Sequence, residues 1–248
     1  MVRLYMLLAQ GLAATRHVIW ATIRRRVGDK TLTTNIQFDL IANAKDSLRR
    51  AVNLLAWKEI ESTDARFKHA ITNAAHSIEL LLKERLRRQD PDLVWENKAK
   101  NTNREPRTVN VDNAISRLEA MARVNFIASD KMMIQYIRKA RNEIEHYEWN
   151  MTGREAKHIV GEALAFAFEF GKKHLDINLD SEFREDDTWA VLIDELYEFT
   201  RAYAARIESM IEERGEQTYY CDACNERTVP VRSCSCELCG HWNNADII

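Results

Sequence analysis

The chain has little glycine or proline, with seven glycines and three prolines in 248 residues. An all-β sandwich or barrel needs a turn roughly every ten residues, and those turns depend on these two residue types. Hydrophobic residues make up 46% of the chain and charged residues 30%, a balance that excludes a disordered protein. Ala, Leu, Glu, Lys and Arg are abundant, so the composition predicts an all-α fold.

Cysteine is absent from the first 220 residues, and all five cysteines lie between Cys221 and Cys239. A disulfide framework would cross-link the large helical part, so this distribution argues against one. Thiols gathered in CxxC pairs are typical of a metal site in a reducing compartment. We therefore expect a cytoplasmic protein.

A hydrophobic run long enough to cross a membrane is also missing. Residues 4–14 are apolar, but Arg16 and His17 end the run well before the roughly 20 residues that a span needs. The run has some features of a secretory signal, yet Gln10 and Gly11 interrupt it. A basic helical extension over residues 1–35, or a start site assigned too far upstream, fits better, and we expect no membrane partner.

Charge is unevenly distributed along the chain, although the net charge is only −2. Residues 1–35 carry six basic and one acidic residue, and residues 36–176 carry 24 basic and 21 acidic. Residues 177–215 carry four basic and eleven acidic, and residues 216–248 carry two basic and five acidic. The chain as a whole is therefore not a polycation built for nucleic acid, and any contact with a polyanion should lie in the N-terminal two-thirds.

Apolar residues recur every three or four positions and predict helices over 37–57, 62–88, 110–122, 129–147 and 152–174. Ser129 or Asp130 is expected to cap the fourth helix, and Thr152 with Glu155 forms a capping box for the fifth. Residues 36–176 are thus predicted to be an antiparallel helical bundle with a polar loop at 90–109. An acidic linker and one long helix over 188–214 follow, within residues 177–215.

The C-terminal residues 216–248 carry two CxxC pairs. Four thiolates supply the tetrahedral site that structural Zn²⁺ prefers, and the segment resembles a zinc ribbon with a short hairpin between the pairs. Cys234 could replace Cys236, and His241 could replace Cys239. Because a closed site has no open position for catalysis and the segment is acidic, a structural knob or protein-contact module is favoured over a nucleic-acid reader. The four expected ligands are Cys221, Cys224, Cys236 and Cys239, and Gly240 follows the second pair, where such a turn commonly needs a residue with positive φ.

The string Arg141-Asn142-Glu143-Ile144-Glu145-His146 is the most informative pattern outside the tail. The ordinary interpretation is an exposed helix with Arg141 paired to Glu145. However, Arg141 falls on the same stripe as Ile137 and Ile144, where an arginine is costly unless it meets an anion or borders a cleft. We expect Arg141 and His146 to lie on or beside a concave surface.

The bundle order, the helix pattern over 68–86 and this Arg-polar-x-x-x-His string resemble the HEPN superfamily, helical domains of prokaryotic toxin and antiphage defence systems. The resemblance covers about residues 36–176. It implies a metal-independent RNA endonuclease in which Arg141, Asn142 and His146 match the catalytic signature. The implied reaction is attack of the ribose 2′-hydroxyl on phosphorus to give a 2′,3′-cyclic phosphate. Toxin members of the family usually have Tyr two residues after the His, where this chain has Glu148.

Residues five apart on an ideal helix point about 140° apart, so one straight helix cannot aim both Arg141 and His146 at one phosphate. The resemblance likewise implies a homodimer with the site at its interface. We expect an Ala-rich face around Ala70, Ala74 and Ala75 to permit close approach of the two subunits. The alternative is a non-catalytic module that binds a nucleotide or protein, with the zinc ribbon as an adaptor. Tyr147 and Trp149 could stack bases or pack, while His69 and His76 are expected to border the core or a dimer seam.

Overall fold

The computed structural model describes residues 37–57, 63–96 and 107–244, so the predicted extension over 1–35 lies outside the described residues. Asp39–Ile248 form one compact unit. The domain boundaries predicted at 176 and 215 stay predictions. The helices of this unit are α2 (Leu40–Ala56), α3 (Thr63–Gln89), the 3₁₀ turn η2 (Pro91–Val94), α4 (Val111–Ala122), α5 (Ala128–His146), α6 (Gly153–Leu175), α7 (Ser181–Arg184), α8 (Thr188–Glu195) and α9 (Tyr197–Glu213).

Capping residues start several of these helices. The Asp39 carboxylate accepts a hydrogen bond from the Ala42 amide at 2.7 Å. The capping box at Thr152 is confirmed, with Glu155 bonded back to the Thr152 amide at 2.8 Å. The predicted cap at Ser129 or Asp130 was wrong, because α5 begins at Ala128 without a side-chain cap. Asp130 instead accepts a hydrogen bond from Arg206 of α9 at 2.6 Å, which uses the carboxylate that a cap would need.

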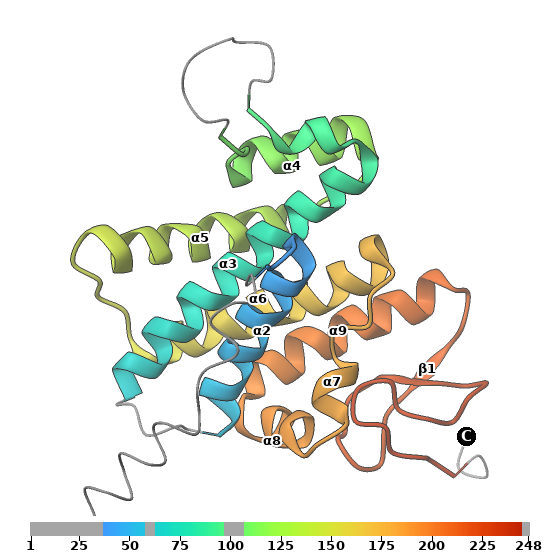
Figure 1. Ribbon diagram of the computed structural model, residues 1–248. Helices are drawn as coiled ribbons and strands as arrows, with labels where there is room; N and C mark the ends of the chain where they lie inside the picture. Colours follow the sequence, from blue (N-terminus) through green and yellow to red (C-terminus); the bar gives the residue numbers. More distant parts are fainter. Residues whose placement is uncertain (1–36, 58–62, 97–106, 245–248) are drawn as a thin grey trace, which may run out of the picture. The chain divides into compact units, whose positions relative to one another are not determined.

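Helix α3 lies at the centre of the bundle and packs against α2, α4, α5 and α6 (Figure 1). The expected close-approach surface at Ala70, Ala74 and Ala75 was wrong, since all three residues are buried within their own chain. Helix α6 lies against both α3 and α9. At Gly161 the backbone of α9 comes so close that a Cβ atom would lie 2.7 Å from the Phe199 nitrogen, so a larger residue would force the two helices apart.

The single long helix predicted over 188–214 was also wrong. The helix breaks at Leu196 (φ −121°, ψ 77°), which separates α8 from α9. The Thr200 hydroxyl donates to the Ile193 carbonyl at 2.7 Å and satisfies a carbonyl that the break leaves open. The break turns Trp189 of α8 onto Phe168 of α6, with ring centroids 5.3 Å apart. The apolar period continues across the break, so the sequence pattern alone did not show it.

After α9 the chain forms a small two-stranded antiparallel sheet, β1 (Thr218–Tyr219) and β2 (Val229–Pro230). The predicted fold class is therefore confirmed as mostly helical with a small C-terminal sheet that bears a four-cysteine cluster. No helix within the described ranges is long and apolar enough to cross a bilayer.

Candidate metal centre and candidate active site

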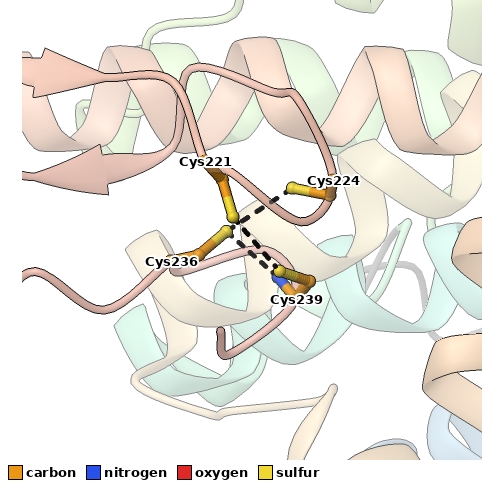
Figure 2. A group of neighbouring side chains, drawn as sticks. All are labelled: Cys221, Cys224, Cys236 and Cys239. Atoms are coloured by element: carbon orange, nitrogen blue, oxygen red, sulfur yellow. Dashed lines mark hydrogen bonds between the residues drawn. The ribbon is translucent and has the colours of Figure 1, made fainter. Parts of the chain in front are cut away.

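Four cysteine side chains meet beside the small sheet, and Figure 2 shows them pointing toward one another. The Sγ atoms of Cys221, Cys224, Cys236 and Cys239 all lie within 4.8 Å of one another. The Cys221–Cys239 and Cys224–Cys236 sulfur pairs are 3.6 Å and 3.7 Å apart. A zinc–sulfur bond of about 2.3 Å gives a tetrahedron whose edges are about 3.8 Å. All five cysteines are free thiols, so the four-sulfur group could hold a metal ion such as zinc.

Two matching turns shape the cluster. In each CxxC pair the residue after the second cysteine has a positive φ, 55° at Asn225 and 80° at Gly240. Each of these residues donates its amide to the carbonyl of the first cysteine at 2.9 Å. This geometry was expected at Gly240, whereas Asn225 shows that asparagine serves the same purpose in the first turn.

Hydrogen bonds prepare one of the sulfurs for a thiolate charge. The Cys239 amide donates to Cys236 Sγ at 3.3 Å, and the Thr228 hydroxyl lies 3.1 Å from the same sulfur. Both groups can donate to a thiolate at this position. A thiolate is the form that binds a metal, so the surroundings of Cys236 suit a ligand.

Cys234 and His241 were the alternative ligands, and neither belongs to the four-sulfur group. Cys234 is buried with its thiol directed to the Val231 carbonyl at 3.8 Å. His241 contributes its backbone carbonyl, which accepts the Cys236 amide at 2.9 Å. Both residues therefore support the loop that carries the second CxxC pair.

The second CxxC pair is also attached to the helical body. Trp189 of α8 donates its indole N–H to the Leu238 carbonyl at 2.7 Å, and Arg184 of α7 donates to the Glu237 carbonyl at 2.9 Å. The Leu238 side chain is fully buried in the core. Arg214 and Lys172 pair with the Glu237 carboxylate. The metal centre is thus part of the packed structure and not a separate knob.

Arg141 of α5 is held between two carboxylates. Its Nη1 lies 3.1 Å from Glu79 of α3, and its Nε lies 3.0 Å from Glu145 one turn later. The Arg141 side chain is 25% exposed, so the arginine is neither sealed in the core nor free in solvent. The i,i+4 ion pair between Arg141 and Glu145 is therefore present. Glu79 is the anion that an arginine on the buried stripe needs.

A group of polar side chains continues from Arg141 across α3 to α2. Lys83 contacts Glu79 at 2.5 Å and the Thr108 hydroxyl at 2.9 Å, while the Nδ1 atom of His76 lies 2.9 Å from the Ser47 hydroxyl. We call the residues Ser47, His76, Glu79, Lys83, Arg141 and Glu145 the seam cluster. Burial raises the pKa of Glu79, but the hydrogen bond and charge of Lys83, followed by the charge of Arg141, lower it overall.

The other two predicted catalytic residues lie on the outside of α5. Asn142 lines a shallow hollow together with Arg138, Lys139 and Tyr147. The His146 side chain is 77% exposed at the last residue of the helix. Arg141 and His146 do not line this hollow, and no contact joins them within the described residues of one chain. The structure therefore brings Arg141 into the seam cluster and leaves Asn142 and His146 facing solvent.

Sequence reasoning missed four members of the seam cluster as site residues. His76 was expected to border the core or a dimer seam, and Ser47, Glu79 and Lys83 were not considered. A signal was present, because His76, Glu79 and Lys83 have the i, i+3, i+7 spacing of one helical face. Of the two aromatic residues beyond α5, Tyr147 is 83% exposed, whereas Trp149 packs against the core.

Comparison of the chain with protein-family models, with curated proteins and with solved structures gave no match.

Proposed function

We propose that Cys221, Cys224, Cys236 and Cys239 hold one structural Zn²⁺ and that residues 216–248 form a zinc ribbon in a cytoplasmic protein. The main support for this proposal is the pair of sulfur–sulfur distances, which match the edges of a zinc–thiolate tetrahedron. Metal analysis of the purified protein tests this assignment. One zinc per chain supports it, and a Cys221–Cys239 disulfide would overturn it.

We also propose that the helical part is a metal-independent RNA endonuclease of the HEPN type, of a prokaryotic toxin or antiphage defence system. The observation that carries the proposal is the C-terminal end of α5, where the Arg-polar-x-x-x-His string reaches the surface. Arg141 is part-exposed beside the seam cluster, and His146 is fully accessible to a phosphodiester. Tyr147 beside Asn142 adds a ring for base stacking, and Arg138 and Lys139 line the same hollow as cations that would exchange their pairs with Asp112 and Glu143 for phosphates.

In this proposal each site residue has a separate task. Arg141 binds the phosphoryl oxygens as charge builds on them, and His146 transfers a proton near neutral pH. Asn142 orients the substrate or one of these groups. To bind a phosphate, Arg141 must exchange part of its contact with Glu79 or Glu145 for the new anion.

A homodimer supplies what one chain lacks, because Arg141 and His146 are not joined by any contact within the described part of one chain. The outer face of α5 offers a surface for a second copy. Met132 and Tyr136, one turn apart on this face, are 64% and 44% exposed, and Tyr147, which follows the last residue of the helix, is 83% exposed. Exposed apolar side chains gathered in this way favour a protein contact.

Incubation of the purified protein with RNA in EDTA tests the activity. We expect cleavage to 2′,3′-cyclic phosphate ends that Arg141→Ala and His146→Ala each abolish. The melting temperature should stay unchanged in His146→Ala and fall only slightly in Arg141→Ala, which also loses the ion pairs with Glu79 and Glu145. A mixture of the two variants should regain one mixed site per heterodimer. Tyr136→Glu should give a monomer without activity, while Tyr197→Glu, at an exposed tyrosine of α9, serves as the matched control.

One observation favours the second candidate, a non-catalytic module that binds a nucleotide or partner protein. The two carboxylates on Arg141 cancel its charge, and Glu143 and Glu148 lie nearby in the sequence. That arrangement disfavours a polyanion. If metal-free RNA stays intact over a range of pH, while the protein binds a mononucleotide or a protein through the ribbon, this second function replaces the first.

A further inference from the structure

The chemistry of the proposed cleavage needs two proton transfers. One group must take the proton of the ribose 2′-hydroxyl, and another must give a proton to the departing 5′-oxygen. The Arg-polar-x-x-x-His string supplies one proton carrier per chain, His146, because arginine stays protonated in proteins. A second titratable group near Arg141 would complete the reaction.

His76 is placed for this role by one contact and by its position on α3. Its Nδ1 atom lies 2.9 Å from the hydroxyl of Ser47 on α2. It also shares a face of α3 with Glu79, three residues later, and Glu79 contacts Arg141 of α5 at 3.1 Å. The imidazole is thus held at α2, near enough to feel the charge of the arginine that would bind the phosphate, whereas His146 extends into solvent from the end of α5.

We propose that His76 is the general base of the proposed RNA cleavage and that Ser47 is its positioning residue. This inference rests on the proposed ribonuclease function. The proposed role uses the tautomer in which the Nδ1–H of His76 donates to Ser47 Oγ, because that tautomer leaves the lone pair on Nε2 free to accept a proton. A neutral imidazole with one nitrogen fixed in this way is the ordinary arrangement of a histidine base.

The electrostatic surroundings of His76 agree with a neutral base. The charged groups that face it are Arg141 and Glu145 from α5 and Glu79 and Lys83 from α3, while α2 presents the uncharged Ser47. Burial, followed by the charge of Arg141, lowers the pKa of His76 below its ordinary 6.5 despite the opposing charge of Glu79. The unprotonated form therefore dominates at neutral pH.

The step balances without any other reactant. The ribose O2′ attacks phosphorus and forms the P–O2′ bond while the P–O5′ bond breaks. His76 Nε2 takes the proton from O2′, and a protonated His146, supplied by the second copy in the proposed dimer, gives a proton to O5′. The products are a 2′,3′-cyclic phosphate and a 5′-hydroxyl, and both histidines return to their starting states by proton exchange with water.

The test is cleavage of a short fluorescent RNA in EDTA by the full-length protein and its variants between pH 4.5 and 9. We expect His76→Gln to lower kcat about 100-fold or more, because a general base contributes about that much. The variant should also lose the acidic limb of the pH–rate profile, since that limb reports protonation of the base. His69→Gln, seven residues earlier on α3 and exposed, is the matched control and should stay within twofold of the original protein.

Ser47→Ala provides a second measurement should the His76 variant fold poorly. It removes the hydroxyl that holds Nδ1 but leaves the imidazole, so kcat should fall about 10-fold at unchanged KM with the acidic limb retained. If the original protein cleaves RNA and His76→Gln keeps its rate and pH profile, His76 is not the base and the proposed function still stands. If the folded original protein does not cleave RNA at any pH, both proposals are overturned.

Discussion

The metal centre and the seam cluster differ in how far apart their residues lie in the sequence. The four cysteines of the metal centre come from one segment, and the outer two are 18 positions apart. The seam cluster joins α2, α3 and α5, and its Glu79–Arg141 contact spans 62 positions. A local site can be derived from spacing alone, because a CxxC turn fixes both of its sulfurs. A cluster of distant residues depends on how the helices pack, which spacing does not reveal.

The largest effect is expected in the metal centre. If the four cysteines hold zinc as proposed, Cys236→Ser should abolish metal binding and lower the melting temperature by on the order of 10 °C, since metal binding by a structural zinc site contributes directly to folding free energy. The loss should reach the helical body, because Leu238 is buried in its core. Metal analysis and calorimetry measure both effects. Cys234→Ser is the matched control, and equal metal loss in that variant would show that the ligand set is wrong.

The next largest effect is expected in the seam cluster. Glu79→Gln leaves Lys83 and Arg141 without their shared carboxylate, and we expect a loss of about 1–2 kcal/mol at pH 7 for these part-exposed pairs. The folded state lowers the pKa of Glu79, so its contribution is present above the unfolded value near 4.5 and is lost as pH falls through the folded pKa. Urea unfolding at pH 7 and pH 3 measures this. The gap between variant and original protein should narrow as the pH falls from 7 to 3, and a gap of constant size would contradict the ion-pair explanation.

Breaking the hydrogen bond between the helical body and the second CxxC pair should have a smaller effect. Trp189→Phe keeps an aromatic ring against Phe168 and Phe199 but removes the N–H that donates to the Leu238 carbonyl. We expect a loss of about 1 kcal/mol with zinc content unchanged. Chelator titration should show faster metal release, because the second CxxC pair is held less firmly. Unchanged stability and unchanged release would mean that this hydrogen bond does not couple the ribbon to the body.

The smallest effect is expected from a purely local feature. Thr152→Ala removes the hydroxyl of the capping box and should cost about 1 kcal/mol. Hydrogen exchange should speed up in the first turn of α6 and stay unchanged at the metal centre and in α3. Faster exchange across the whole bundle would show that the cap stabilises more than its own helix.

These examples show which parts of the molecule sequence reasoning could reach. Local rules predicted the capping box, the positive φ at Gly240 and the fold class, since each depends on neighbours in the chain or on composition. The break at Leu196 was missed because packing of Trp189 on Phe168 overrides a continuous apolar period. Asp130 was misassigned as a cap because its partner, Arg206, is 76 positions away.

Sequence reasoning likewise found one part of the candidate active site and missed another. The string from Arg141 to His146 was found as a motif, but the partners of Arg141 across the seam were not, because α3 and α5 meet only in the folded chain. His76 was recognised as a residue near the core and not as a neighbour of Ser47. Contacts of this kind need the relative placement of helices, which the apolar stripes leave open.

The attachment of the second CxxC pair has a consequence for synthesis of the protein. A ribosome makes residues 236–239 only after every helix of the body, yet α7, α8 and the core use Glu237 and Leu238 as packing partners. The surface against which these last residues pack therefore stays uncovered until they emerge. If the four cysteines bind zinc as proposed, zinc supply at the moment of synthesis should determine how many new chains complete their core and how many are left for chaperones and proteases.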